Sequence, residues 1–138
     1  MCAQLGIYGM RRNTRCAILR QTQYPLKAMT TLLARMADES ARRREAARVM
    51  AYRRLRAALS ELLPPGSEVW VFGSVLKPGR FREDSDVDIA VVSLPAGRSE
   101  AWLQSELGLR LERPVDVLNL NETGLRAKIE KEGERWTL

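Results

Sequence analysis

The chain has 138 residues, of which 45% are hydrophobic, and it carries a net charge of +6 without a single histidine. This length predicts one domain whose core is large enough to fold without metals or disulfides. The missing histidine excludes Ser-His-Asp and Cys-His catalysis, so any chemistry is expected to use carboxylates, lysines, hydroxyls or bound ions.

Location is indicated by what the sequence lacks. It has no apolar run long enough to span a membrane, and its N-terminal stretch lacks the continuous apolar core of a secretory signal. We therefore expect a cytoplasmic protein with no membrane partner. Its two cysteines, Cys2 and Cys16, are expected to be free thiols, a single bridge being the alternative. Two thiols without histidine cannot complete a four-ligand zinc site.

Positive charge is concentrated in the first part of the chain, where residues 1–60 hold 13 Lys and Arg against 3 acids. Such a segment suits an acidic or polyanionic partner, and a solvated arginine-rich helix is the alternative. Residues 1–36 show no clear period and are expected to form a poorly defined N-terminal extension. Residues 37–138 are expected to form the domain.

The first predicted element is a long basic helix over residues 38–63, which the "PPG" of residues 64–66 ends. Asp38 or Ser40 is expected to cap its first turn.

Apolar side chains recur at spacings of three and four along this helix, at Tyr52, Leu55, Leu59 and Leu62. Arg44 and Arg48 fall on the same face, before Tyr52. We expect them either to contact a partner or to extend into water.

After Gly66 the spacing changes to that of strands. We expect strands at 68–72 and 86–92, a turn at Pro78-Gly79, a helix over 98–112, a third strand at 114–120, a closing helix over 122–133 and a short final strand at 135–138. Ser99 is the expected cap of the second helix, and Gly133 the expected end of the last. The order predicts an α/β (α+β) protein with a small mixed β-sheet flanked by helices.

The second strand carries paired acids. In a strand, alternate residues share a face about 6.6 Å apart, so Asp86 and Asp88 face one way while Val87, Ile89 and Val91 face the core. Two such charges repel by about 3 kcal/mol at an effective dielectric near 20. On an exposed strand water screens most of this repulsion, so the pair alone does not establish a site.

Two further features support a site. Asp116 shows the same alternation with valines in the third strand, so three carboxylates would converge if that strand lies beside the second. Hard oxygen ligands suit magnesium or manganese. Gly73-Ser74 ends the first strand, where a backbone without Cβ and a hydroxyl can approach a phosphate. Together these residues predict a nucleoside-triphosphate site with metal ions.

Gly73-Ser74, followed after 11 residues by Asp86-Val87-Asp88 and then by an Asp on a later strand, resembles the nucleotidyltransferase superfamily of DNA polymerase β. The segments "VFGS", "SDVDIAVV", "RPVDVLNL" and "LRAKIEKEGERW" are similar to the minimal nucleotidyltransferases (MNT), the MntA-like antitoxins of HEPN/MNT toxin–antitoxin pairs. The resemblance covers about residues 40–138 and implies the nucleotidyltransferase fold.

The resemblance also implies roles. Asp86 and Asp88 would bind two Mg²⁺ ions, Mn²⁺ being the alternative. Asp116 would complete one metal site and help deprotonate the acceptor, while Gly73 and Ser74 hold the β- and γ-phosphates. The implied reaction is transfer of AMP from ATP to a tyrosine of a HEPN toxin, which makes the protein an adenylyltransferase and an antitoxin.

The acceptor is expected on a partner, because the 22 residues after Asp116 are too few for an appended acceptor-binding domain. Arg44 and Arg48 are candidates to dock that partner. One alternative is an antitoxin that neutralises its toxin by contact without chemistry. Another is a nucleic-acid-binding module, which the lack of interleaved aromatic residues disfavours. The sequence carries no signal for an oligomeric state.

Overall fold

The computed structural model describes residues 26–138, with side chains from residue 28 onward. The chain divides into two units, Met1–Met36 and Ala37–Leu138. Cys2 and Cys16, and the expectation that their thiols are free, lie outside the described residues. No helix in residues 26–138 is both long enough and apolar enough to cross a membrane.

The first helix, α1, spans Leu26–Leu62. Its predicted end is confirmed to within one residue, but its predicted start is wrong, because Asp38 and Ser40 lie inside the helix and cap nothing. The cause is local: residues 26–36 are mostly good helix formers and contain neither glycine nor proline. A helix therefore continues through a segment in which burial imposes no pattern.

The part of α1 before Ala37 carries an exposed apolar row. Its side chains recur at helical spacing and are 57–61% exposed: Met29, Leu32, Leu33 and Met36. These apolar residues have the spacing of a helix face, but that face is not buried.

A four-stranded sheet forms the centre of the second unit, in the order β3-β2-β1-β4. The strands are β1 (Glu68–Phe72), β2 (Val87–Val91), β3 (Val115–Asn119) and β4 (Glu134–Thr137). β1 is antiparallel to both β2 and β4, whereas β2 and β3 are parallel. The predicted mixed sheet flanked by helices is confirmed, and so is the short final strand.

Three shorter elements connect the strands: the 3-10 turn η1 (Gly73–Leu76), α2 (Glu100–Leu111) and α3 (Arg126–Glu132). Ser99 caps α2 as predicted, because its Oγ accepts a hydrogen bond from the Trp102 amide at 3.2 Å. Gly133 follows the last residue of α3, also as predicted.

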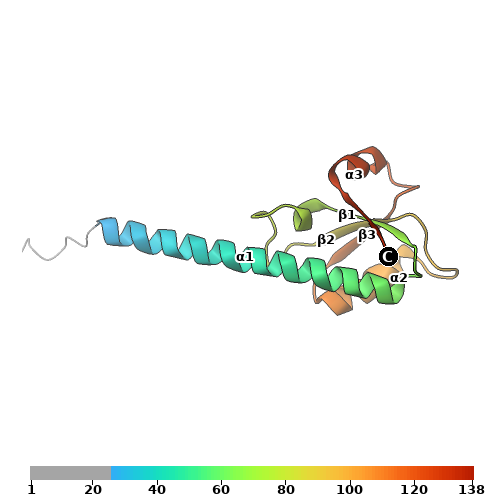
Figure 1. Ribbon diagram of the computed structural model, residues 1–138, viewed down its shortest axis with the longest axis horizontal. Coiled ribbons are helices and arrows are strands. Elements are labelled where there is room, and N and C mark those ends of the chain that lie inside the picture. Colours follow the sequence, from blue (N-terminus) through green and yellow to red (C-terminus); the bar gives the residue numbers. More distant parts are fainter. Residues whose placement is uncertain (1–25) are drawn as a thin grey trace, which may run out of the picture. The chain divides into compact units, whose positions relative to one another are not determined.

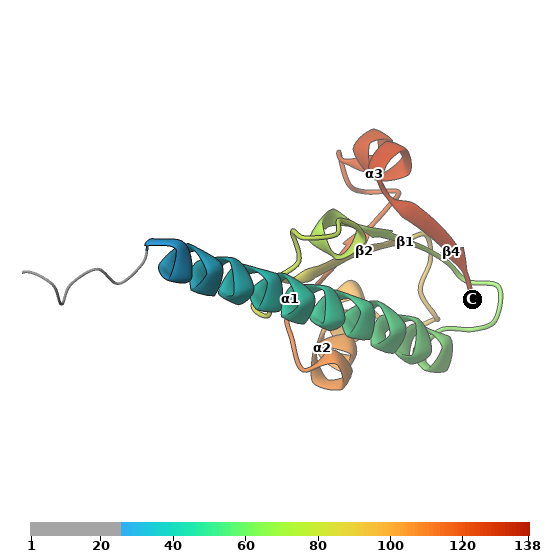
Figure 2. The ribbon, with the colours of Figure 1, turned by 60° about the vertical axis from the view of Figure 1, so that its left-hand side comes forward.

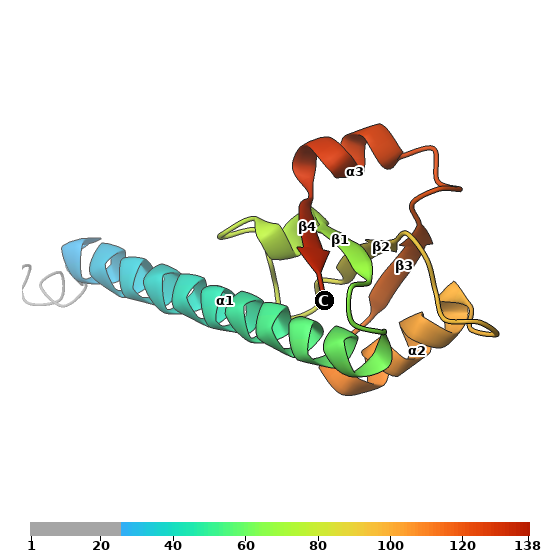
Figure 3. The ribbon, with the colours of Figure 1, turned by 45° about the vertical axis from the view of Figure 1, so that its right-hand side comes forward.

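The helices divide between the two faces of the sheet. Figure 1 and Figure 3 show α2 and the C-terminal half of α1 on one side and α3 on the other. Alternate strand residues face α1 and α2 and form the main core with them; among these are Val69, Val71, Val87, Ile89, Val115, Val117, Leu55, Leu59, Leu103 and Leu107. This face holds most of the buried apolar surface that stabilises the unit.

The opposite face of the sheet is only partly covered. Ile129 of α3 packs there with Ala90 and Leu120, against the half-buried Trp70 and Leu118. Figure 2 shows α3 above β1, with its C-terminal end leading into β4. The same face also carries the acids of β2 and β3, so α3 and the acids share one side of the sheet.

Candidate active site

The pairing of β2 with β3 brings two of the three predicted acids together. In the parallel register Asp88 lies opposite Asp116, between the Val87–Val115 and Ile89–Val117 pairs. Neighbouring strands lie about 4.8 Å apart, and the flanking pairs face the core. The third strand therefore lies beside the second, which is the condition under which the acids were expected to converge. Asp88 and Asp116 therefore stand at one level on the partly covered face.

β2 begins at Val87, one residue later than predicted, so Asp86 is the exposed residue just before the strand. Its position is set by the preceding loop. The Arg113 Nη1 donates a hydrogen bond to the Ser85 carbonyl oxygen at 3.1 Å, and its guanidinium lies 4.6 Å from the Phe81 ring centre. Phe81 is fully buried. Arg113 thus anchors the loop that carries Asp86.

Sequence reasoning did not find Arg113. Its only local signal is a cation two residues before a strand that carries an acid. The stacking on Phe81 and the bond to Ser85 join residues about thirty positions apart, and they follow from the tertiary structure.

The Asp88 carboxylate occupies the space that a side chain at position 73 would need. Phe72 is the partner of Asp88 in the β1–β2 ladder, and Gly73 follows it with φ of 81°. A Cβ atom at position 73 would lie 2.1 Å from the Asp88 Oδ2. Any side chain here would displace the carboxylate, so glycine is required both by the backbone angle and by the acid beside it. Ser74 comes next, half-buried at the start of η1.

The three acids influence one another electrostatically. Asp88 is half-buried, and burial raises the pKa of its carboxyl above the ordinary aspartate value. The negative charges of Asp116 and then of Asp86 raise the same pKa further. The fold therefore holds a partly desolvated carboxylate against its own electrostatic preference, as functional sites commonly do.

The donor set suits a hard divalent cation. Carboxylate oxygens are the ligands that Mg²⁺ and Mn²⁺ prefer, and a dication would offset the repulsion that raises the pKa of Asp88. Within the described residues, no group of three or more Asp, Glu or Cys side chains is arranged so that it could hold a metal ion. Asp86 and Asp116 are exposed, so their side chains can rotate toward an ion. The residues fit a divalent cation in chemistry and in backbone placement.

A cavity of about 230 Å³ opens beside Gly73 and Asp88. Its lining combines an apolar wall with charged residues from the loop after η1 and from α3: Phe72, Gly73, Lys77, Asp88, Leu125, Lys128, Ile129 and Glu132. Lys77 lies in the loop after η1. Lys128 and Glu132 were not singled out, because only the folded position of α3 brings them here.

Of the two arginines on the face of Tyr52, Arg48 is bonded within the domain and Arg44 is exposed as expected. The Arg48 Nη2 pairs with Glu45 at 2.7 Å, and its Nη1 donates to the Val75 carbonyl oxygen at 3.1 Å. Arg48 therefore links η1 to α1 instead of extending into water, and its role in docking a partner stays a prediction. Arg44 remains exposed and donates to the Ser40 Oγ at 3.2 Å.

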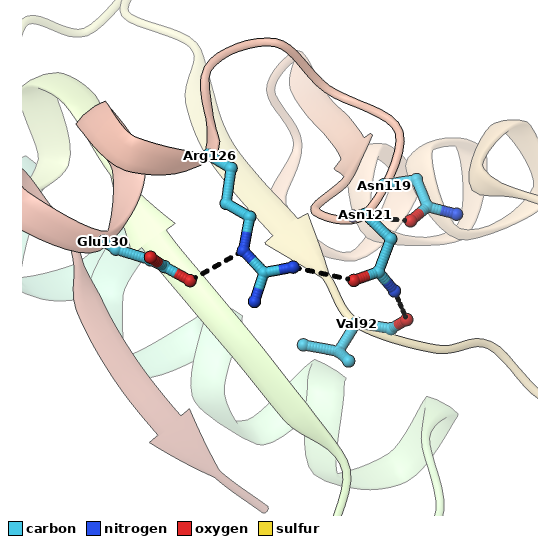
Figure 4. A network of polar contacts seen from close by, with 5 residues as sticks. All are labelled: Val92, Asn119, Asn121, Arg126 and Glu130. Atoms are coloured by element: carbon cyan, nitrogen blue, oxygen red, sulfur yellow. Dashed lines mark hydrogen bonds and ion pairs between the residues drawn. The ribbon is translucent and has the colours of Figure 1, made fainter.

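A polar network fixes the segment that leads into α3 (Figure 4). The Asn121 Nδ2 donates to the Val92 carbonyl oxygen at 3.0 Å, and its Oδ1 accepts from the Arg126 Nη1 at 3.2 Å. The Arg126 Nε donates to Glu130 at 2.9 Å, and the Asn121 amide donates to the Asn119 Oδ1 at 3.0 Å. The network joins α3 to the C-terminal ends of β2 and β3.

The chain is similar to a known protein family and to two solved structures. The family model described as "Polymerase beta, Nucleotidyltransferase" matches residues 67–135. No curated protein matches the chain. A crystal structure of a toxin–antitoxin with AMP-PNP is 22% identical with a TM-score of 0.50, covering 62% of this chain and 73% of that chain.

A second solved structure, the toxin–antitoxin MntA-HepT, is 19% identical with a TM-score of 0.46, covering 65% of this chain and 72% of that one. The family model spans half of the chain and contains Gly73, Asp88 and Asp116. The chain belongs to the polymerase β nucleotidyltransferase family.

Proposed function

We propose that the protein transfers AMP from ATP to a protein hydroxyl, a tyrosine of a HEPN toxin, and thereby acts as an antitoxin. The observation that carries the proposal is the in-register pair of Asp88 and Asp116 beside the Gly73 turn, in a chain of the nucleotidyltransferase family. The likeness to a toxin–antitoxin crystallised with AMP-PNP supports the nucleotide and the type of partner.

Each site residue has a chemical role in this proposal. Asp86, Asp88 and Asp116 would hold two Mg²⁺ ions, or Mn²⁺ in their place. When bound, such ions neutralise phosphate charge and make the acceptor hydroxyl easier to deprotonate. Gly73 lines the cavity beside Asp88, where a phosphate would approach the backbone, and the Ser74 hydroxyl would donate to it.

The transfer itself is an in-line displacement. The acceptor oxygen forms a bond to the α-phosphorus, and the bond from that phosphorus to the bridging oxygen breaks, so pyrophosphate leaves. In this proposal Asp116 takes the acceptor proton, and its exposure beside the half-buried Asp88 supports that role. An exposed base can be reached by a hydroxyl on a macromolecule.

The test is transfer to a candidate toxin. The full chain is incubated with ATP, Mg²⁺ and a HEPN protein encoded beside it, and intact mass is measured. We expect increments of one AMP on the toxin with the wild type and with Glu61→Gln, which changes an exposed acid on α1. We expect none with Asp88→Asn or Asp116→Asn.

Two outcomes would contradict the proposal. The first is an absence of AMP increments with a toxin that nevertheless forms a complex. The second is full neutralisation of the toxin by a double variant with Asp86 and Asp88 both changed to Asn. That result would make the protein an antitoxin by contact alone.

A further inference from the structure

One wall of the cavity beside Gly73 is a single face of α3. Leu125, Lys128, Ile129 and Glu132 line it at spacings of three and four, which places side chains on the same side of a helix. Ile129 is 2% exposed and packs on the sheet, so the rotation of α3 about its axis is fixed. Lys128 therefore faces the cavity because of how the core packs.

α3 is also fixed at both ends. Its first turn is tied to β2 and β3 through Arg126 and Asn121 (Figure 4). At its other end a Cβ on Gly133 would lie 2.6 Å from the Ile129 oxygen and 3.0 Å from the Val71 oxygen, so the chain passes close against β1. A side chain on such an element is held at a defined place.

The two lysines of the cavity differ in their pairing. The Lys77 Nζ lies 3.9 Å from the Glu132 Oε2, and both side chains are about half exposed, at 52% and 46%. An exposed pair of this kind is weak and exchanges readily for a stronger anion. Lys128 forms no ion pair within residues 26–138. Among the described residues, the cavity thus offers one unpaired ammonium group and one that Glu132 holds.

We propose that Lys128 binds the β- or γ-phosphate of the nucleotide, and that Glu132 weakens this binding by holding Lys77. The inference rests on the proposed function and assigns residues to its triphosphate. A polyphosphate next to Gly73 and Asp88 would bring several negative charges into a cavity that is already lined by two acids, Asp88 and Glu132. Lys128 offsets that charge directly, and Lys77 does so only after leaving Glu132.

The experiment uses the full chain with Mg²⁺ and measures the dissociation constants of AMP-PNP and of inorganic tripolyphosphate by calorimetry. Lys128→Met is compared with Lys131→Met, which removes the same charge from the same helix outside the cavity. Because a charge-assisted hydrogen bond is lost, we expect Lys128→Met to weaken both ligands by about tenfold. Lys131→Met should change neither constant by more than about twofold.

Glu132→Gln provides a test of opposite sign. It frees Lys77 and removes a negative charge, so both ligands should bind about two- to fivefold more tightly. Thermal melting of each variant checks that α3 stays folded. Equal constants for Lys128→Met and Lys131→Met would overturn the inference, as would a loss seen with AMP-PNP but not with tripolyphosphate. Failure of the wild type to bind AMP-PNP would instead refute the proposed function.

Discussion

The contact between Gly73 and Asp88 can be measured as a free energy. Alanine at position 73 would adopt φ of 81°, which costs about 1–2 kcal/mol for a residue with a Cβ. That Cβ would also lie 2.1 Å from the Asp88 Oδ2 and 3.1 Å from its Cγ, so the carboxylate has to move. Overpacking of this kind costs about 1–3 kcal/mol more. Urea unfolding of Gly73→Ala should therefore show a loss of about 2–5 kcal/mol.

Gly97→Ala is the matched control, because Gly97 has a similar φ of 77° but no atom within 4 Å of the position that a Cβ would take. It should lose only the conformational part, about 1–2 kcal/mol. In an Asp88→Ala background, Gly73→Ala should cost no more than Gly97→Ala, since its obstacle is gone. Equal losses for Gly73→Ala and Gly97→Ala in the wild-type background would refute the reasoning, as would an unchanged loss in the Asp88→Ala background.

Three further results are expected. Asp88→Asn should raise the free energy of unfolding by about 1 kcal/mol at neutral pH in EDTA, because it removes a partly buried charge next to two like charges; a decrease would contradict this. Arg113→Met should lower kcat for AMP transfer by a larger factor than it changes KM for ATP, while Arg110→Met, at an exposed position of α2, should change neither constant. Equal effects of the two variants would exclude the inference that Arg113 positions the loop that carries Asp86. Burial and, after it, the hydrogen bond to Glu134 raise the pKa of Tyr52. The protonated tyrosine therefore contributes stability that is fully present below the ordinary tyrosine pKa of about 10. This stability is lost as pH rises through the raised pKa. Tyr52→Phe should unfold at lower urea than the wild type at pH 8 and show a smaller decline above about pH 10; an equal decline would count against the assignment.

Much of the fold followed from spacing alone. The change from a helical to a strand period after Gly66, the cap at Ser99 and the stop at Gly133 are local signals, and the structure confirms them. The predicted start of α1 is too late, because the prediction began the helix at the cap-like residue Asp38. The exposed row at Met29, Leu32, Leu33 and Met36 already has helical spacing and lies within α1.

The site divides in the same way. The spacing of acids and valines was enough to place Asp88 and Asp116 on one face, because alternation in a strand is a property of the backbone. Arg113 was not predictable, since it contacts Ser85 and Phe81, which are distant in sequence. Lys128 was not predictable either, since only the folded position of α3 brings it to the cavity. Arg48 shows the converse: its face on α1 was predicted correctly, but its bond to the Val75 carbonyl oxygen, 27 residues away, was not.

The alignment of β2 with β3 has a consequence for quality control of the protein. If the pairing register of β3 with β2 shifted by one residue, Asp116 would face the hydrophobic core, and Val115 and Val117 would face solvent. A molecule with the shifted register would lose the buried apolar contacts that stabilise the core, so it would not persist as a folded but inactive species. Misassembly should therefore be visible as unfolding or aggregation, and the specific activity of a preparation should track its folded fraction.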